Sequence, residues 1–193
     1  MKKLLNINWA LLAVMVFFAS SGCESQDEDM NPDDNKSGYF LKAKVDGKLV
    51  EFKTETLLSA DMGSIEIGST IPKIYNLSLS GARQVSGEST LEEVITIVIT
   101  ETTPITPKSY TGLVPFEYGL KGVLLGYSLE AEEKAYVTDV NDPNVNLEIT
   151  EMKQNSIKGK FNGVVIDFLS GESKTITEGE FFLIFKPGED LNS

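Results

Sequence analysis

The chain has 193 residues, of which 29 are acidic, 17 are basic and none is histidine, so its net charge at pH 7 is −12. Nucleic-acid-binding domains present a basic surface, so this balance argues against nucleic acid as a partner, and it also disfavours contact with an anionic membrane surface. Without histidine, the usual Ser-His-Asp and Cys-His catalytic arrangements and histidine-bearing zinc sites are excluded. An enzyme with this composition would have to use Asp, Glu, Lys, Tyr, Ser or Thr.

Residues 1–22 have the pattern of a secretory signal peptide, with Lys2 and Lys3 at the positive start and an apolar core over residues 9–19. A membrane-spanning helix needs about 20 apolar residues, so this shorter core predicts cleavage rather than a span. Removal of the signal peptide takes both lysines away and leaves a mature chain with a net charge of −14.

The only cysteine, Cys23, directly follows the small residues Ser20-Ser21-Gly22. This segment resembles the lipobox of bacterial lipoproteins, although Ser20 stands where that motif more often has leucine. The resemblance implies that diacylglycerol is attached to the Cys23 thiol, that signal peptidase II cleaves before Cys23, and that the new amine is acylated. Because two or three acyl chains make release negligible, covalent lipid on Cys23 is the expected membrane attachment. The alternative is a secreted protein with a free cysteine near its start.

We expect residues 23–38 to be the acylated cysteine followed by a flexible acidic linker. Residues 24–37 contain six acids, one lysine and no large apolar side chain except Met30, which is too little apolar surface to fold. An acidic tract at this place also resembles the export signal that takes some Bacteroidota lipoproteins to the outer face of the outer membrane. The resemblance implies a surface-exposed location in the outer membrane. The alternatives are a plain solvated tether and a protein that faces the periplasm.

Residues 39–193 predict one all-β domain of short strands separated by Gly, Pro, Asn and Asp. Asp46-Gly47 lies between the alternating runs 40–45 and 48–53, and Asp-Gly in this setting is a strong signal for a type I′ hairpin. Residues 93–100 are almost continuously apolar, which predicts a central strand covered on both faces. The other expected strands are 64–68, 74–80, 122–129, 134–139 and 145–152.

A last hairpin is expected at the end of the domain, with a three-residue loop between the arms 156–169 and 173–187. Such a loop would place Phe161 opposite Phe181, with the glycine of each Gly-x-Phe motif leaving room for an aromatic neighbour.

About ten strands and no strong helix beyond the signal peptide predict an antiparallel two-sheet β-sandwich, with a β-barrel as the alternative. The stretch from Phe40 to Phe52 and the closing segments 147–150, 157–161 and 176–181 resemble a group of uncharacterised Bacteroidota envelope lipoproteins with a single β-sandwich domain. The resemblance implies a β-sandwich fold and a cell-envelope location, and it lends no activity and no functional residue.

One loop carries several hard oxygen donors, Asp139, Asn141, Asp142 and Asn144. Ca²⁺ binds six to eight oxygens of this kind, so the loop is a candidate calcium site. The glycine and the bidentate glutamate of an EF-hand are missing, and the alternative is a turn whose side chains hydrogen-bond their own backbone. No other metal site and no cofactor are expected.

Two further sets of residues are weaker candidates. The acidic turn Glu130-Ala131-Glu132-Glu133 offers carboxylates of the type that glycoside hydrolases use, but neighbouring residues of a strand point to opposite faces, which favours a solvated turn. Tyr110, Tyr118 and Tyr127 would form a binding patch if exposed, and otherwise belong to the core or its rim.

These features predict a lipid-anchored cell-envelope lipoprotein that acts as a non-enzymatic binding or accessory module for an envelope protein or a glycan. One alternative is a structural or assembly subunit that pairs through an edge strand. The last alternative is a carboxylate-based hydrolase.

Overall fold

The computed structural model describes residues 38–53, 57–66, 72–84, 91–129 and 132–185. The described residues form twelve strands: β1 (Phe40–Val45), β2 (Lys48–Lys53), β3 (Leu57–Ile65), β4 (Ile74–Gln84), β5 (Leu91–Glu101), β6 (Ser109–Thr111), β7 (Leu113–Phe116), β8 (Gly119–Leu129), β9 (Lys134–Thr138), β10 (Val145–Met152), β11 (Ser156–Ile166) and β12 (Ser173–Ile184). Over these same ranges, the structure holds no helix with the length and apolarity that crossing a membrane requires. The all-β class predicted from the sequence is confirmed.

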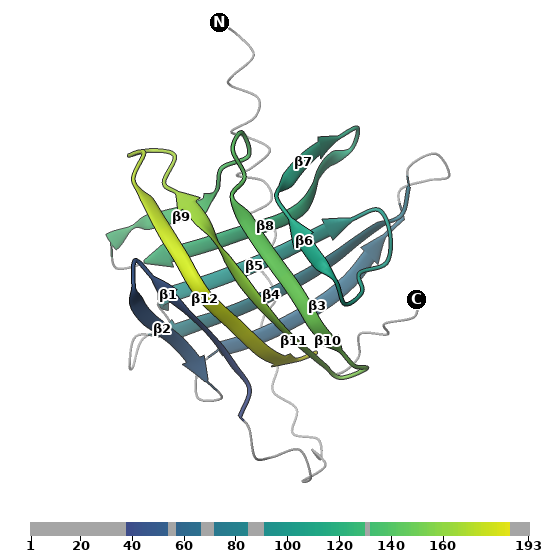
Figure 1. Ribbon diagram of the computed structural model, residues 1–193, viewed down its shortest axis with the longest axis horizontal. Helices are drawn as coiled ribbons and strands as arrows, with labels where there is room; N and C mark the ends of the chain where they lie inside the picture. The colour runs from purple at the N-terminus through teal and green to yellow at the C-terminus, as the bar shows by residue number, and fades with distance from the viewer. Residues whose placement is uncertain (1–37, 54–56, 67–71, 85–90, 130–131, 186–193) are drawn as a thin grey trace, which may run out of the picture. The chain divides into compact units, whose positions relative to one another are not determined.

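The described strands belong to one continuous antiparallel sheet, whose main path runs β2-β1-β12-β11-β9-β8-β5-β4-β3. β10 pairs with β11 and β6, and β7 pairs with β8. Figure 1 shows β1, β12, β11 and β10 crossing in front of β3, β4, β5 and β8, so the sheet folds over on itself. A short pairing of Val165 and Ile166 with β9 joins the two layers. The architecture is therefore a nearly closed barrel-like sheet, which corresponds to the barrel alternative.

Apolar side chains from every second residue of the strands fill the space between the layers. On β5, for example, Ile95, Ile97 and Ile99 are buried in one core with residues from most of the other strands. Val94 and Val98 on the opposite face of β5 are only half-buried, so the expectation of a strand covered on both faces is met in part.

β1 and β2 form the hairpin that Asp46-Gly47 predicts. Asp46 and Gly47 have φ values of 49° and 81°, the positive values that a type I′ turn requires. The turn is also fixed to β12, because the Asp46 amide donates to the Thr175 carbonyl and the Thr175 amide donates to Asp46 Oδ1, both at 2.9 Å. A local signal thus makes the turn, and a contact 129 residues away in sequence holds it in place.

The last hairpin forms, but its predicted register is wrong. The connection spans residues 167–172, which is longer than expected. Phe161 lies opposite Gly179, and Gly159 lies opposite Phe181, whereas the sequence prediction places the two phenylalanines opposite each other. A Cβ atom would lie 2.4 Å from the Phe181 ring if added at Gly159, and 2.7 Å from the Phe161 ring if added at Gly179. Each ring covers the glycine across from it, and this fit selects the observed register.

Several strands differ from the prediction in extent. β3 begins at Leu57 rather than at Ser64, and β6 and β7 are short strands that the sequence pattern does not predict. Tyr110 of β6 is buried, and its hydroxyl accepts a hydrogen bond from the Thr106 amide at 2.8 Å and donates to the Thr106 carbonyl at 2.7 Å. These bonds hold the proline-containing segment before β6 against that strand.

Candidate functional site

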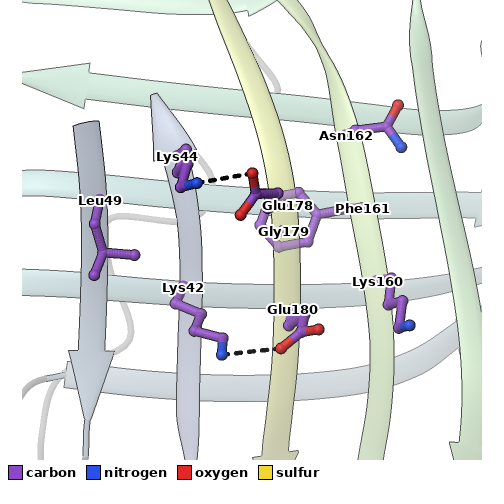
Figure 2. Close-up of a pocket in the computed structure, with 9 residues that line it drawn as sticks. All are labelled: Lys42, Lys44, Leu49, Lys160, Phe161, Asn162, Glu178, Gly179 and Glu180. Carbon is purple, nitrogen blue, oxygen red and sulfur yellow. Dashed lines mark hydrogen bonds and ion pairs between the residues drawn. The ribbon is translucent and has the colours of Figure 1, made fainter. Parts of the chain in front are cut away.

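A depression of about 390 Å³ lies on the outer face of the sheet, across β2, β1, β12 and β11 (Figure 2). Successive residues of a strand point to opposite faces, so the strands that bury Leu41 and Phe181 inside present charged side chains here. Gly179 contributes no side chain to the lining, and the ring of Phe161 lies next to it. The lining residues are Lys42, Lys44, Leu49, Lys160, Phe161, Asn162, Glu178, Gly179 and Glu180.

Two ion pairs cross from β1 to β12 within the depression. Lys42 Nζ lies 2.9 Å from Glu180 Oε2, and Lys44 Nζ lies 2.8 Å from Glu178 Oε1. Hydrogen bonding and charge from Lys42 lower the pKa of Glu180. This carboxylate is therefore ionised at neutral pH, when it holds the Lys42 ammonium in a fixed position.

The second pair depends on a β-bulge in β12. Lys42 faces Glu180 but Lys44 faces Thr177, so β12 uses one more residue than β1 over the same length. β12 has the same extra residue relative to β11. Glu178 has a φ of 52°, a left-handed conformation that is uncommon outside glycine and that bulges can impose. The bulge leaves both Thr177 and Glu178 exposed, which places the Glu178 carboxylate beside Lys44.

On the β11 side, the depression presents Lys160 and Asn162. In the part of the chain that the structure describes, the ammonium of Lys160 has no carboxylate within ion-pair distance, although its charge contributes to the lowered pKa of Glu180. The Asn162 Oδ1 accepts a hydrogen bond from Asn146 Nδ2 at 3.3 Å, and the Asn162 residue is exposed. These two side chains offer hydrogen-bond donors to a ligand.

The depression combines three lysines with two glutamates, so it is a locally basic spot on an acidic protein. Ammonium and amide donors are suited to carboxylate and hydroxyl groups. A general acid for glycoside hydrolysis needs a raised pKa, whereas the pKa of Glu180 is lowered. The donors of this surface are suited to contact a polar or anionic ligand.

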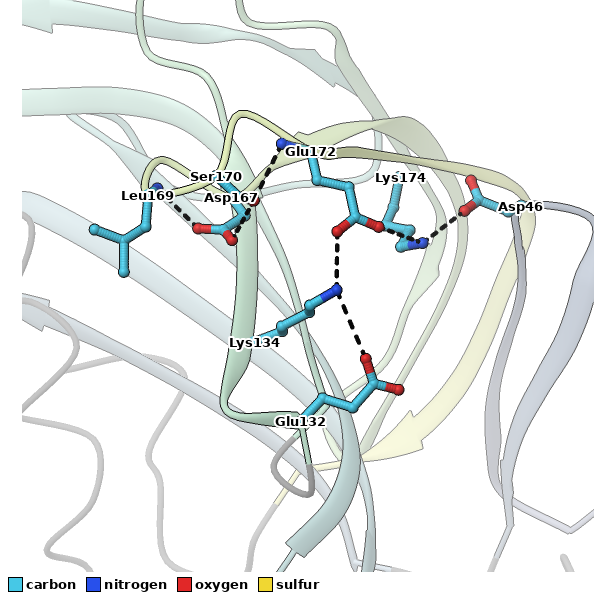
Figure 3. Close-up of polar contacts among 8 residues, drawn as sticks. All are labelled: Asp46, Glu132, Lys134, Asp167, Leu169, Ser170, Glu172 and Lys174. Atoms are coloured by element: carbon cyan, nitrogen blue, oxygen red, sulfur yellow. Dashed lines mark hydrogen bonds and ion pairs between the residues drawn. The ribbon is translucent and has the colours of Figure 1, made fainter.

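A second group of charges lies at the β11–β12 turn (Figure 3). Glu172 pairs with Lys134 Nζ at 2.9 Å and with Lys174 Nζ at 3.0 Å, and Lys174 also lies 3.1 Å from Asp46 Oδ2. The hydrogen bonds from the two lysines lower the pKa of Glu172 to about 2. This chain of ion pairs fastens the base of the turn to β9 and to the β1–β2 turn.

Tyr136 of β9 is buried beside this group. Among the described residues, no donor or acceptor has hydrogen-bonding geometry with its hydroxyl. Burial, followed by the close approach of the Glu172 carboxylate, raises the pKa of Tyr136. Lys174 Nζ lies 5.6 Å from the centre of the Tyr136 ring, close enough for a cation–π contact.

Glu93 forms a third, buried polar group at the start of β5. It accepts a hydrogen bond from the Tyr127 hydroxyl at 2.8 Å and pairs with Arg83 at 3.1 Å. Arg83 also donates to the Glu51 carbonyl at 3.4 Å, which connects β4 to β2. Burial and the Glu93 carboxylate raise the pKa of Tyr127. The charge of Glu93 is thus compensated inside the fold, which gives this network a structural role.

The residues singled out from the sequence have mixed outcomes. Cys23 lies outside the described residues, so lipid attachment there stays a prediction. Asp139 forms the Asx turn that was the alternative to a calcium site, because its Oδ1 accepts hydrogen bonds from the Asn141 amide at 2.8 Å and from Asn141 Nδ2 at 3.2 Å. Asp142 and Asn144 are exposed. Within the described ranges, no three His, Cys, Asp or Glu side chains gather as a metal site, and calcium binding by this loop stays untested.

The other two candidate sets have different outcomes. Glu130 lies outside the described residues, and Glu132 approaches Lys134 at 3.8 Å in the ion-pair chain. Tyr110 and Tyr127 are buried, whereas Tyr118 is 39% exposed, so the three tyrosines form no common surface. The depression was not predicted from the sequence. The available signal was a charged residue at every second position, in Lys42-x-Lys44 on the first strand and Glu178-x-Glu180 on the last.

No protein-family model, no curated protein and no solved structure matches this chain. A function must therefore be argued from the site itself.

Proposed function

We propose that this protein is a lipid-anchored lipoprotein of the bacterial outer membrane whose barrel-like domain binds an anionic glycan without transforming it. The observation that carries the proposal is the basic depression on an acidic protein, with Lys160 and Asn162 as available donors. Carboxylates and hydroxyls of a sugar acid would accept hydrogen bonds from these two side chains, while the rest of the acidic surface repels anionic ligands elsewhere.

The neighbouring ion pairs support recognition rather than catalysis. Lys42 and Lys44 are each held by a glutamate on β12, so their positions are set before a ligand arrives and little side-chain entropy is lost on binding. The low pKa of Glu180 keeps it a hydrogen-bond acceptor for sugar hydroxyls. Attachment through Cys23 and the acidic linker would tether this domain to the membrane.

A glycan array that includes uronic-acid oligosaccharides tests the binding proposal. We expect the wild-type protein to retain acidic glycans and Lys160→Ala to retain them at least tenfold less well. Lys48→Ala is the matched control, because Lys48 is exposed on the neighbouring strand β2 and does not line the depression. Retention of no glycan, or equal retention by Lys160→Ala and the wild type, would refute glycan binding at this surface.

Cell fractionation tests the anchor separately. Mass spectrometry of the mature N-terminus should find a thioether-linked diacylglycerol on Cys23, and Cys23→Ala should leave the membrane fraction. Protease treatment of intact cells should degrade the wild-type domain if it is displayed at the surface. A free thiol at residue 23, or membrane retention of Cys23→Ala, contradicts the lipid anchor.

An assembly subunit is a second candidate, and the two ends of the sheet path supply the observation that favours it. β2 carries Lys48, Glu51 and Lys53, charges that protect an edge strand, whereas β3 carries one acid and ends at the exposed Ile65. If β3 adds to a partner's sheet, Ile65→Lys should reduce the mass of the purified complex in light scattering. An unchanged mass, or a monomeric wild-type protein, argues against this candidate.

A further inference from the structure

The tip of the β11–β12 turn exposes two large apolar side chains. Leu169 is 99% exposed and Phe168 is 49% exposed, although turns usually carry Gly, Asn, Asp, Ser or Pro at such positions. Figure 3 shows Leu169 directed away from the ion pairs at the base of the turn. Leu169 buries almost no surface in the domain and about half of Phe168 is open to solvent, so both side chains are available to a partner.

The turn that carries them is held by its own hydrogen bonds. The Asp167 carboxylate accepts from the Leu169 amide at 2.8 Å and from the Ser170 hydroxyl at 2.6 Å. The Asp167 amide donates to the Glu172 carbonyl at 2.8 Å, and the Gly171 amide donates to the Asp167 carbonyl at 2.7 Å. Gly171 adopts a φ of 75°, which its missing side chain permits. The conformation of the tip is therefore set without a partner.

The base of the turn is fixed to the domain as well. Glu172, at the end of the turn, is held between Lys134 of β9 and Lys174 of β12, and Lys174 continues to Asp46 of the first hairpin. Because both the tip and its base are ordered in advance, insertion of Phe168 and Leu169 into another surface would cost little conformational entropy.

The charge around the tip distinguishes between kinds of partner. The ion pairs and hydrogen bonds at the turn join more carboxylates than ammonium groups, so this group of side chains is negative overall; its members are Asp46, Glu132, Asp167 and Glu172 with Lys134 and Lys174. Loops that enter a bilayer interface usually combine apolar side chains with Lys and Arg, and an anionic lipid surface would repel this turn. A protein socket that is apolar inside and basic at its rim complements both the side chains and the charge.

We propose that Phe168 and Leu169 form a preorganised anchor that inserts into an apolar, basic-rimmed socket on a partner protein. This surface is separate from the charged depression, since neither Phe168 nor Leu169 lines it. Aromatic side chains are enriched in the buried centres of protein interfaces, and the acidic flanks would speed association with the basic rim.

Photo-crosslinking in the cells that produce the full-length protein tests the proposal. Leu169→p-benzoylphenylalanine should give one discrete adduct with another protein on illumination, and the adduct should disappear when Phe168→Ser is added. Val114→p-benzoylphenylalanine is the control, because Val114 is 53% exposed on β7 and should give no such adduct. An adduct with lipid, an adduct with a second copy of this chain, or no adduct overturns the proposal.

The protein identified in the adduct is then purified and titrated against variants of the anchor. Leu169→Ser should weaken binding at least tenfold, and Asp167→Ala should weaken it several-fold because the tip loses the two hydrogen bonds that the Asp167 carboxylate accepts. Val114→Ser should bind as the wild type does. Urea unfolding of Leu169→Ser should match the wild type, since Leu169 is almost fully exposed. Equal affinity of Leu169→Ser and the wild type for the crosslinked protein overturns the proposal even when an adduct forms.

Discussion

On the inner face of β11 and β12, two phenylalanine rings cover two glycines, whereas on the outer face of β12 lysines from β1 pair with glutamates. The inner contacts allow no added atom, because a Cβ on Gly159 would lie 2.2 Å from the Glu148 carbonyl oxygen and one on Gly179 would lie 2.4 Å from the Phe161 carbonyl oxygen. The outer side chains lie at the surface, where water and salt screen their charges.

The inner Phe–Gly contacts stabilise the fold, whereas the outer Lys–Glu pairs are accessible to a ligand. Close packing against backbone atoms is costly to disturb, because the backbone cannot move without breaking ladder hydrogen bonds. Exposed ion pairs are screened by water and salt, so each contributes little to the free energy of unfolding. Changes on the outer face should therefore alter ligand recognition while leaving the fold intact.

The largest effect is expected from Gly179→Ala, whose added methyl group would press on the Phe161 carbonyl oxygen. We expect the free energy of unfolding to fall by about 3 kcal/mol in urea titrations, at the upper end for overpacking. Gly63→Ala on β3 is the control, because a Cβ there meets no atom within 4 Å and should change stability by no more than about 0.5 kcal/mol. Similar losses in the two variants would contradict the packing argument.

An intermediate effect is expected from Glu93→Gln, which removes a charge that is buried inside the sheet rather than exposed outside it. The variant should lose about 2 kcal/mol, because Arg83 loses its ionic partner and the bond to Tyr127 becomes weaker. The neighbouring Glu92→Gln should be nearly neutral, since Glu92 is exposed. Urea unfolding of both variants measures the contrast, and a neutral Glu93→Gln would show that the buried network is dispensable.

A smaller effect is expected from Glu180→Gln on the outer face. Its pair with Lys42 is exposed, so the loss should be about 0.5 kcal/mol at low salt and should shrink at high salt. The measurement is urea unfolding at two ionic strengths. A loss that stays constant with salt would mean that Glu180 acts through packing rather than charge.

The smallest effect is expected at the exposed ion pairs of the β11–β12 turn, where it should depend on pH. The pKa of Glu172 is lowered from 4.5 to about 2 in the folded protein, so its contribution is complete above pH 4.5 and is lost as the pH falls through about 2. Glu172→Gln should melt slightly below the wild type at neutral pH, and the difference should close over that acidic window. Thermal melts that keep a constant difference down to pH 2 would exclude the charge of Glu172 as its source.

Local signals in the sequence predicted the elements that depend on few residues. Asp46-Gly47 supplies the two positive φ values of the first hairpin, and the apolar run 93–100 predicts the strand β5, although only one of its faces is fully buried. The register of the last hairpin was not predictable in this way. The predicted and the observed register both place an aromatic side chain near each glycine, and the fit of the Phe181 and Phe161 rings over the glycines directly opposite selects the observed one.

The candidate site was even less predictable from local sequence signals. Lys42 and Glu180 are far apart in the sequence, and nothing local indicates that β1 lies beside β12. The bulge at Thr177 and Glu178 was also not predictable from the sequence, because the residue with positive φ is Glu178. A glycine at that position would have indicated a bulge, whereas glutamate disfavours this conformation. The loop proposed as a calcium site is different, because the alternative to that site was a turn stabilised by neighbouring residues alone. The Asx turn at Asp139 forms as that alternative predicts.

The sequence by itself determined the strand content, the first hairpin, the acidic charge and the histidine-free composition, because each depends on residue identity or on neighbours a few positions apart. Only the tertiary structure decided that the strands form one folded sheet, that lysines of β1 meet glutamates of β12, and that Phe168 and Leu169 stand on a fixed turn. These features depend on pairings between distant segments, whose free energy comes from packing that no single stretch of the chain encodes.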